Sequence, residues 1–366
     1  MASPRFIATG MVALACALCA PAAFSAPPTF AAVTPLPAGQ TLRLPTDFGA
    51  HPAYRTEWWY ATGWLSTKAG KQLGFQLTFF RSATEHDPAN PSAFAPKQLI
   101  IGHAALSDPS VGKLLHDQRS AREGFGLAYA KVGDTDVQLD DWHLRRAANG
   151  AYQASVVTRE FVLTLDLKPT QPPLLQGEGG YSRKGPRPGQ ASYYYSEPQL
   201  TASGSLTRAG GAAETVGGVA WLDHEWSDRV LDADASGWNW VGANLDDGGA
   251  LMAFQVRGKT GAKLWSHATW RDASGKITQY APEQVNFRAR SLWRSPRTNT
   301  EYPVATELLT GDTTWNLTPL QPDQELDSRR STGAVYWEGA VRVSRDGKPA
   351  GRAYLEMTGY DKPMKF

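Results

Sequence analysis

The segment Phe161-Val162-Leu163-Thr164-Leu165-Asp166-Leu167 decides the fold class of this chain. Every second residue is large and apolar, so Phe161, Leu163, Leu165 and Leu167 would share one face of a β-strand. Similar segments of five to ten residues, rich in aromatic and β-branched side chains, recur from Thr56 onward and are separated by turn residues. The pattern predicts an all-β protein.

Composition and turn signals agree with this prediction. The chain has 35 Gly, 25 Pro and 13 Trp but only 20% charged residues, which is typical of many short strands joined by tight turns. Asp246-Asp-Gly-Gly249 and Asp346-Gly347 supply residues that tolerate positive φ and predict hairpins. No window of twelve or more residues has a convincing amphipathic helical period, although Lys113–Glu123 could form a short helix.

The charge balance argues against a nucleic-acid partner. Lys+Arg 37 against Asp+Glu 35 gives a formal charge of +2, and no basic stripe or tail is present. A hydrophobic content of 42% excludes general disorder. We therefore expect a folded protein that binds no nucleic acid.

The N-terminus carries a targeting signal. Arg5 precedes the apolar run 6–20, and small-residue cleavage sites follow, which predicts a secretory signal peptide over residues 1–25. The run is too short for a transmembrane anchor. Cys16 and Cys19 lie inside it, and neither follows a leucine at the position that a lipoprotein signal prefers, so no lipidation is expected. Cleavage would leave no cysteine, which excludes disulfides, a thiol nucleophile and a cysteine zinc site. We expect a periplasmic or secreted protein.

The length and an internal similarity predict two domains. The hairpin Trp59…Leu65…Phe75-Gln76…Arg81 resembles Trp240…Leu245…Phe254-Gln255…Arg257. We predict a linker or surface arm over residues 26–46, an N-terminal domain over 47–228 and a C-terminal domain over 229–366. The segment Gln171–Ser192, rich in Pro, Gly and Gln, is predicted to be a long ordered loop or lid, with a linker as the alternative.

Two polar and aromatic clusters carry a family resemblance. The first is Asp47-Phe-Gly-Ala-His51 with the stretch 55–65, and the second is Gly218-Val-Ala-Trp-Leu-Asp-His-Glu-Trp-Ser-Asp228 with Gly237-Trp-Asn-Trp240. Together with Leu174-Leu-Gln-Gly-Glu-Gly-Gly180, Tyr336-Trp-Glu-Gly-Ala340 and Tyr354-Leu-Glu-Met-Thr-Gly-Tyr360, they resemble the secreted AttH-like proteins related to carotenoid 1,2-hydratase, also labelled predicted secreted hydrolases. The resemblance extends over nearly the whole chain after the signal.

The resemblance implies two lipocalin-like β-barrels or sandwiches packed side by side, with an apolar pocket within or between them. Family members include proteins encoded beside ABC-transporter components, enzymes that hydrate acyclic carotenoids and fungal relatives that promote cycloadditions, so the fold alone does not decide function. Our leading hypothesis is an exported protein that binds an apolar small molecule, a lipid or isoprenoid, at the domain junction. The alternatives are a hydratase-like enzyme acting on such a molecule and an accessory component of an ABC-transport system.

The acids of the second cluster suggest a site. In a strand, Asp223 and Glu225 would point to one face and His224 to the other. Burial between aromatic walls would raise a carboxyl pKa and keep a proton donor available at neutral pH, while His224 could donate to Glu57 or Asp47 across the domain contact. The candidate catalytic residues are Asp223, His224, Glu225 and Glu57, and the candidate ligand-binding residues are Trp58, Trp59, Tyr60, Trp221, Trp226, Trp238, Trp240 and Tyr194. Alternatively, the acids form a buried structural network and the tryptophans fill barrel cores or form a carbohydrate platform.

Other chemistries find less support in the sequence. The hydratase branch resembles this chain at His224-x-Trp226 but also carries a Tyr-x-Asp acid, and the corresponding stretch Gly249–Phe254 contains neither residue, which argues against carotenoid hydration. No Gly-x-Ser-x-Gly elbow is present for a serine hydrolase. His51, His103 and His224 have no metal-ligand spacing, so we expect no metal and no cofactor, and His103 is predicted to be a hydrogen-bonded core histidine.

Overall fold

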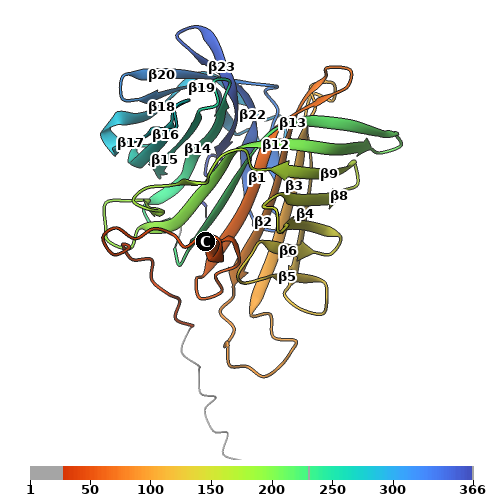
Figure 1. Ribbon diagram of the computed structural model, residues 1–366, viewed down its shortest axis with the longest axis vertical. Helices are drawn as coiled ribbons and strands as arrows, with labels where there is room; N and C mark the ends of the chain where they lie inside the picture. The colour runs from red at the N-terminus through yellow and green to blue at the C-terminus, as the bar shows by residue number, and fades with distance from the viewer. Residues whose placement is uncertain (1–27, 230, 365–366) are drawn as a thin grey trace, which may run out of the picture.

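The computed structural model describes residues 28–229 and 231–364. The predicted signal peptide, with Cys16 and Cys19, lies outside this range. Within it the chain is nearly all β (Figure 1), and the helical segments are two single turns of 3-10 helix, η1 (Thr46–Phe48) and η2 (Pro282–Gln284). Neither turn approaches the length or apolarity that a helix needs to cross a membrane. The all-β prediction is confirmed.

The first of two large antiparallel sheets contains thirteen strands. Its order is β4-β3-β2-β1-β13-β12-β9-β8-β7-β6-β5, with β10 and β11 paired to β12. The strands are β1 (Thr56–Thr67), β2 (Gln72–Ala83), β3 (Gln98–Ser107), β4 (Leu114–Arg122), β5 (Ala128–Ala130), β6 (Asp136–Leu139), β7 (Trp142–Arg146), β8 (Tyr152–Val157), β9 (Phe161–Lys168), β10 (Leu174–Leu175), β11 (Tyr181–Arg183), β12 (Ala191–Arg208) and β13 (Ala213–Ser227).

The second sheet contains ten strands in the order β17-β16-β15-β14-β23-β22-β20-β19-β18, with β21 paired to β22. The strands are β14 (Ala235–Leu245), β15 (Ala250–Gly258), β16 (Lys263–Arg271), β17 (Ile277–Tyr280), β18 (Val285–Arg294), β19 (Glu301–Thr310), β20 (Thr313–Pro319), β21 (Glu325–Asp327), β22 (Val335–Arg345) and β23 (Lys348–Met357). The chain passes from one sheet to the other between Ser227 and Ala235.

The two sheets repeat one strand order. From β4 to β7 the first sheet follows the same path as the second does from β17 to β18, and the short strands paired to β12 correspond to the one paired to β22. The similar hairpins of the sequence are β1–β2 and β14–β15, which hold corresponding places in the two sheets. This correspondence confirms that the hairpin similarity reflects a repeated architecture.

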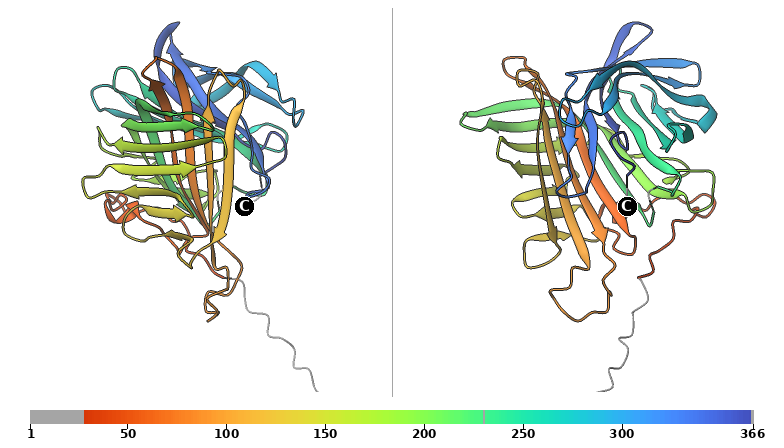
Figure 2. Two further views of the ribbon diagram at one scale, coloured as in Figure 1. Left: turned by 90° about the vertical axis from the view of Figure 1, so that its right-hand side faces the viewer. Right: turned by 180° about the vertical axis from the view of Figure 1, so that it is seen from behind.

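Each sheet curls around its own apolar core, and a third core lies between the sheets. Trp59 and Trp142 are fully buried inside the first sheet, and Trp315 and Trp337 inside the second. The third core joins β1, β12 and β13 of the first sheet to β14, β15, β22 and β23 of the second. Figures 1 and 2 show these strands at the centre of the molecule, where the sheets pack face to face. Along each of these strands, side chains on one side are buried in the core of their own sheet and those on the other side in the core between the sheets. The faces that the two sheets turn toward each other therefore form an interface.

The N-terminal arm packs against the first sheet. Val33 and Leu42 are buried there, the backbone N–H of Leu42 donates to the carbonyl of Gly179, and the hydroxyl of Tyr193 donates to the carbonyl of Thr34. Phe48 of η1 contacts the ring of Tyr195 on β12. The arm therefore covers one end of the first sheet (Figure 1).

Two sequence expectations need correction. Lys113–Glu123 is not a helix but contains strand β4, which lies at the edge of the first sheet and buries only Leu114 and Leu115. The rest of the strand is mostly polar and half-buried, with Ser120 exposed, so it lacks the apolar alternation that would have indicated a strand. One of the recurring strand-like segments of the sequence, Val137–Leu144, predicts a single strand but is instead the hairpin of β6 and β7, which turns at Asp140 with a φ of 59°.

The segment Gln171–Ser192 is ordered, as one of the two sequence alternatives predicted. It contains β10 and β11, and both pair with β12. The chain then leaves β11 and brings Lys184 over the rings of Tyr194 and Phe254, so this segment joins the two sheets.

Candidate functional site

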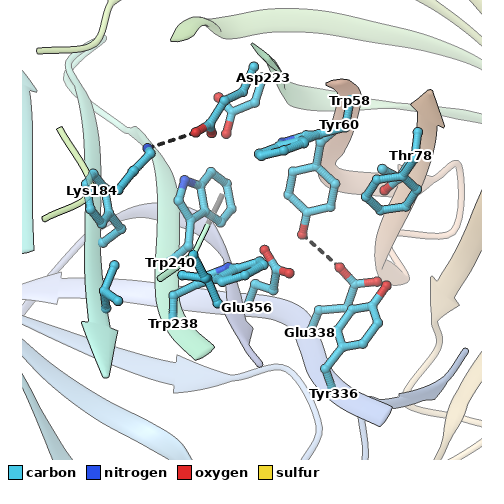
Figure 3. Close-up of a pocket in the computed structure, with 15 residues that line it drawn as sticks. Trp58, Tyr60, Thr78, Lys184, Asp223, Trp238, Trp240, Tyr336, Glu338 and Glu356 are labelled. Atoms are coloured by element: carbon cyan, nitrogen blue, oxygen red, sulfur yellow. Dashed lines mark hydrogen bonds and ion pairs between the residues drawn. The ribbon is translucent and has the colours of Figure 1, made fainter. Parts of the chain in front are cut away.

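A cavity opens between the facing sides of the two sheets. The space between its walls is about 750 Å³ when the solvent-filled mouth is included, and the centre of a water-sized molecule can reach about 80 Å³ of it. Its walls come from β1, β2 and β13 of the first sheet, β14, β15, β22 and β23 of the second, and the segment that follows β11. Figure 3 shows its aromatic rings and carboxyl groups pointing toward one another from both sides.

The first wall is a patch on three neighbouring strands. Trp58 lies opposite Phe80 on one side and Glu225 on the other, and Tyr60 lies opposite Thr78 and Asp223. Alternation along each strand brings these side chains to one face, so two rows of three residues meet the cavity. The lining residues of this wall are Trp58, Tyr60, Thr78, Phe80, Asp223 and Glu225.

The second wall uses the corresponding strands of the other sheet. Trp240 lies opposite Phe254 on β15 and Glu356 on β23, and Glu356 lies opposite Glu338 on β22. In both walls a tryptophan thus lies opposite a glutamate on the neighbouring strand: Trp58 opposite Glu225, and Trp240 opposite Glu356. The lining residues of this wall are Trp238, Trp240, Phe254, Val256, Tyr336, Glu338 and Glu356.

Asp223 is the best-held acid of the first wall. Its carboxylate oxygens accept hydrogen bonds from the hydroxyls of Tyr194 and Ser196 and from the indole N–H of Trp221, each at 2.6 Å. Burial raises the pKa of Asp223 to about 7, and the neighbouring Glu225 carboxylate adds to the rise, whereas the three hydrogen bonds oppose it. Asp223 is therefore poised to exchange a proton near neutral pH.

Glu225 is paired with a cation from the ordered segment after β11. The Lys184 ammonium lies 2.9 Å from Glu225 Oε1, and both side chains are nearly buried. The same ammonium lies 4.2 Å from the centre of the Phe254 ring on the opposite wall. Lys184 thus connects the two walls, and it forms an ion pair with Glu225 at the cavity.

The second wall contributes two further acids. Burial raises the pKa of Glu356 to about 8, with the charges of Asp223 and Glu225 adding to the rise. Burial and the nearby Glu356 raise the pKa of Glu338 well above its ordinary value. Both groups are therefore neutral carboxylic acids at pH 7. The cavity combines aromatic walls with proton donors, an arrangement suited to holding an apolar molecule and exchanging protons with it.

A separate polar network lies on the opposite face of β1 and β13. Glu57 Oε1 accepts hydrogen bonds from His51 Nδ1 at 2.7 Å and His224 Nε2 at 2.8 Å, and Glu57 Oε2 accepts one from Arg81 Nε at 2.8 Å. The His224 ring stacks on Trp59, and the His51 ring stacks on Trp226. The network lies where the N-terminal arm covers the first sheet, and it does not line the cavity.

The charges of this network are mutually supporting. Although burial favours protonation of Glu57, the hydrogen bonds from His224 and His51 and the charge of Arg81 hold its pKa well below the ordinary range. Burial lowers the pKa of His224 to about 4, so this ring is neutral. For His51 the hydrogen bonds with Asp47 and Glu57 outweigh burial and raise the pKa. An ionised glutamate thus lies beside the Arg81 guanidinium and accepts hydrogen bonds from two imidazoles, of which that of His224 is neutral.

These three residues are also the possible metal ligands of the described chain. One ligand atom each from His51, Glu57 and His224 lies within 4.8 Å of the others. However, each of these atoms already takes part in a hydrogen bond, and Arg81 places a positive charge on the same carboxylate. The geometry is that of a satisfied hydrogen-bond network, which the sequence had offered as the alternative to catalysis.

The structure divides the residues that the sequence singled out. Trp58, Tyr60, Asp223, Glu225, Trp238 and Trp240 meet at the cavity. Tyr194 and Trp221 lie behind its wall and hold Asp223. Glu57, Trp59, His224 and Trp226 lie on the other face of the first sheet. The sequence predicted that His224 would bond Glu57 across the domain contact. This expectation is wrong, because Glu57 and His224 lie on neighbouring strands of the same sheet.

Sequence reasoning missed the acids of the second wall. Glu338 and Glu356 each stand alone in an apolar strand, within Tyr336-Trp-Glu-Gly-Ala340 and Tyr354-Leu-Glu-Met357, and an isolated acid in such a strand is the signal that could have found them. Lys184 lies in the segment predicted to be a lid but was not assigned to the site. His103 bonds the hydroxyls of Tyr336 and Ser331 and is buried, which matches its predicted role.

Comparison with known proteins identifies the family. The sequence matches the AttH-like family over residues 35–360. The chain belongs to the AttH-like family. A crystal structure of an AttH candidate from Nitrosomonas europaea is 58% identical in sequence, with a TM-score of 0.84, and the match covers 90% of this AttH-like chain and 100% of the other. No curated protein matches the sequence.

More distant structures share the fold of this AttH-like protein. Kievitone hydratase from Nectria haematococca has a TM-score of 0.67 at 14% identity, covering 92% of this chain and 98% of the hydratase. CghA bound to Sch210972 has a TM-score of 0.52 at 13% identity, covering 84% of this chain and 89% of CghA. At these identities the likeness shows the fold alone, which is the tandem lipocalin-like architecture expected from the resemblance.

Proposed function

We propose that this AttH-like protein is an exported binding protein that holds an apolar small molecule, a lipid or isoprenoid, in the cavity between the sheets. The observation that carries the proposal is the character of the walls, where the aromatic side chains of Trp58, Phe80, Trp238, Trp240 and Phe254 surround the cavity. Concave pockets lined mainly by hydrophobic and aromatic side chains, with a few polar groups among them, are typical of small-molecule sites. Removing an apolar ligand from water supplies the driving force.

The location and partners of the protein remain predictions from its sequence. The predicted signal peptide supports a periplasmic or secreted location. The proposed association with an ABC transporter rests on the family resemblance alone. A binding protein outside the cytoplasm could deliver its ligand to such a system.

Binding is tested with the fluorescent probe N-phenyl-1-naphthylamine, which brightens in apolar surroundings. We expect saturable binding to the wild-type protein and weaker binding to Trp238→Ala. Trp293→Ala is the matched control, since Trp293 packs against Tyr302 on the second sheet and does not line the cavity. Mass spectrometry of solvent extracts from the natively purified protein would then identify the ligand. Equal probe affinity in both variants, with no extracted apolar species, would contradict the proposal.

A second candidate function is acid–base catalysis on the bound molecule. The observation that favours it is Asp223, a buried acid that titrates near neutral pH beside the aromatic walls. Transfer of its proton to one carbon of an alkene leaves a carbocation on the other carbon, which the faces of Trp58 and Trp240 would stabilise. Water then adds to that carbon, its surplus proton passes to the Glu225 carboxylate, and the product is an alcohol. A hydratase is among the proteins that share the fold.

Catalysis is tested with farnesene in heavy water. Hydration would add one non-exchangeable deuterium to carbon and one hydroxyl group, which mass spectrometry detects. We expect the alcohol from the wild-type protein and a loss of at least about tenfold in rate with Asp223→Asn, while N-phenyl-1-naphthylamine binds equally to both. Absence of the alcohol with a protein that binds the probe would leave binding as the function.

A further inference from the structure

Glu338 has an unusual hydrogen-bonding state at the cavity wall. Its side chain is fully buried, and its Oε2 accepts a hydrogen bond of 2.9 Å from the hydroxyl of Tyr60 on the opposite wall (Figure 3). Its Oε1 has no hydrogen-bond partner among the described residues. Buried polar atoms are nearly always paired, and one that is not commonly marks a place where a ligand supplies the partner.

The free oxygen of Glu338 is a donor rather than an acceptor. Glu356 lies directly opposite on β23, and the phenols of Tyr60, Tyr336 and Tyr354 also surround the group, so no cation among the described residues stabilises its charged form. Burial keeps the carboxyl protonated, as its raised pKa indicates. Because Tyr60 donates to Oε2, that oxygen acts as the carbonyl of the acid. The hydroxyl proton therefore lies on Oε1 and is available to the cavity.

The charges of the cavity restrict what that donor can meet. Four carboxyl groups line it, from Asp223, Glu225, Glu338 and Glu356, against one lysine that is already paired with Glu225. A ligand carboxylate would enter beside Glu225 without a free cation and would lose its hydration. A pure hydrocarbon would leave the Glu338 hydroxyl unpaired, at the cost of a buried hydrogen bond.

We propose that Glu338 is the polar anchor of the cavity, and that the ligand is an uncharged, apolar molecule with a carbonyl oxygen that accepts a hydrogen bond from Glu338 Oε1. Tyr60 is the positioning residue, because its hydroxyl fixes the orientation of the carboxyl. This inference rests on the proposed binding function and narrows its ligand class. It sets carbonyl-bearing isoprenoids or lipids apart from fatty acids and plain hydrocarbons.

The experiment compares three probes that share one carbon skeleton: farnesal, farnesene and farnesoic acid. Quenching of tryptophan fluorescence reports their binding, since Trp58, Trp238 and Trp240 line the cavity. We expect farnesal to bind about tenfold more tightly than farnesene at pH 7, equivalent to about 1.4 kcal/mol and thus to one buried hydrogen bond. Farnesoic acid is expected to bind more weakly than farnesal.

Two substitutions of Glu338 connect this preference to the residue. Glu338→Gln keeps an N–H donor at the same place and should keep the preference for farnesal, whereas Glu338→Leu removes the donor and should abolish it. Glu197→Gln is the matched control, because Glu197 is also a buried acid with a raised pKa but does not line the cavity. Tyr60→Phe should weaken the preference without abolishing it.

The outcomes separate the two proposals. Equal binding of farnesal and farnesene, or an unchanged preference in Glu338→Leu, would overturn the role of Glu338 and leave apolar binding intact. Failure of all three probes and of N-phenyl-1-naphthylamine to bind would overturn both proposals. A preference that is lost in Glu338→Leu and retained in Glu338→Gln and Glu197→Gln would establish Glu338 as the anchor.

Discussion

Glu356 on β23 lies directly opposite Glu338 on β22, on the sheet face that meets the cavity. Like charges at opposed positions of neighbouring strands destabilise a sheet, and here Glu338 is fully buried and Glu356 is half-buried. The pair is compatible with the fold only while the carboxyls hold their protons.

This pair predicts a pH-dependent stability. The unfolded chain releases the Glu356 proton near its ordinary pKa of 4.5, whereas the folded chain keeps it to about 8. The free energy of unfolding should therefore fall as the pH rises through this window, by roughly 1.4 kcal/mol for each unit of pKa difference. Urea unfolding at about pH 5 and pH 8 measures the fall. Glu356→Gln should reduce it, and the exposed control Glu85→Gln should not; equal slopes in all three proteins would contradict the assignment.

The ion pair of Lys184 and Glu225 should stabilise the cavity. Lys184→Met leaves the Glu225 carboxylate without its cation in a nearly buried place, and we expect a loss of about 3 kcal/mol. The double variant Lys184→Met/Glu225→Gln should recover most of that loss, since no unpaired charge remains. A double-mutant cycle from urea unfolding gives the coupling energy. If the single and double variants were equally unstable, the loss would come from the lysine's packing on Phe254 instead.

The network around Glu57 should affect stability but not ligand affinity. Glu57→Gln leaves Arg81 without its buried counter-charge, for which we expect a cost of about 3–5 kcal/mol. Its probe affinity should equal that of the wild type, because the network faces away from the cavity. Chemical unfolding and N-phenyl-1-naphthylamine titration measure the two quantities separately. A folded Glu57→Gln protein that no longer bound the probe would show that the network also serves the cavity.

Close approach of the two sheets should make Gly74 irreplaceable. A Cβ at this residue of β2 would lie 2.5 Å from the Cβ of Ala340 on β22, so the sheets would have to separate. We expect Gly74→Ala to cost about 1–3 kcal/mol. Gly217→Ala is the control, since its Cβ would meet only a carbonyl oxygen at 3.6 Å. Thermal unfolding compares the variants, and equal midpoints would mean that the interface adapts.

Alternation along the strands allowed part of the site to be predicted. The two-residue period separates Asp223 and Glu225 from His224, and the structure gives those acids to the cavity and the histidine to the opposite face. The same rule separates Trp58 from Trp59, yet both were grouped as ligand-binding residues because aromatic character was weighed above position. The period is a local property, so a sequence can reveal it without knowledge of the tertiary fold.

Local patterns could point to the two acids of the second wall singly, but they could not predict that these acids meet. Glu338 and Glu356 are neighbours only because β22 pairs with β23 in one register, and they meet Tyr60 only because the two sheets pack face to face. Neither relationship is written in the spacing of residues along the chain. Strand β4 was misassigned for a related reason, since its sequence is mostly polar and only its pairing with β3 makes it part of the sheet.

The repeated strand order has a consequence for how this site can change. In a symmetric dimer both walls of such a cavity would be copies of one surface, and every substitution would appear twice. Here one polypeptide encodes the two walls at separate positions, with Lys184, Asp223 and Glu225 on one side and Glu338 and Glu356 on the other. A substitution can therefore change one wall without changing the other, so the two walls can bind chemically different ends of one ligand.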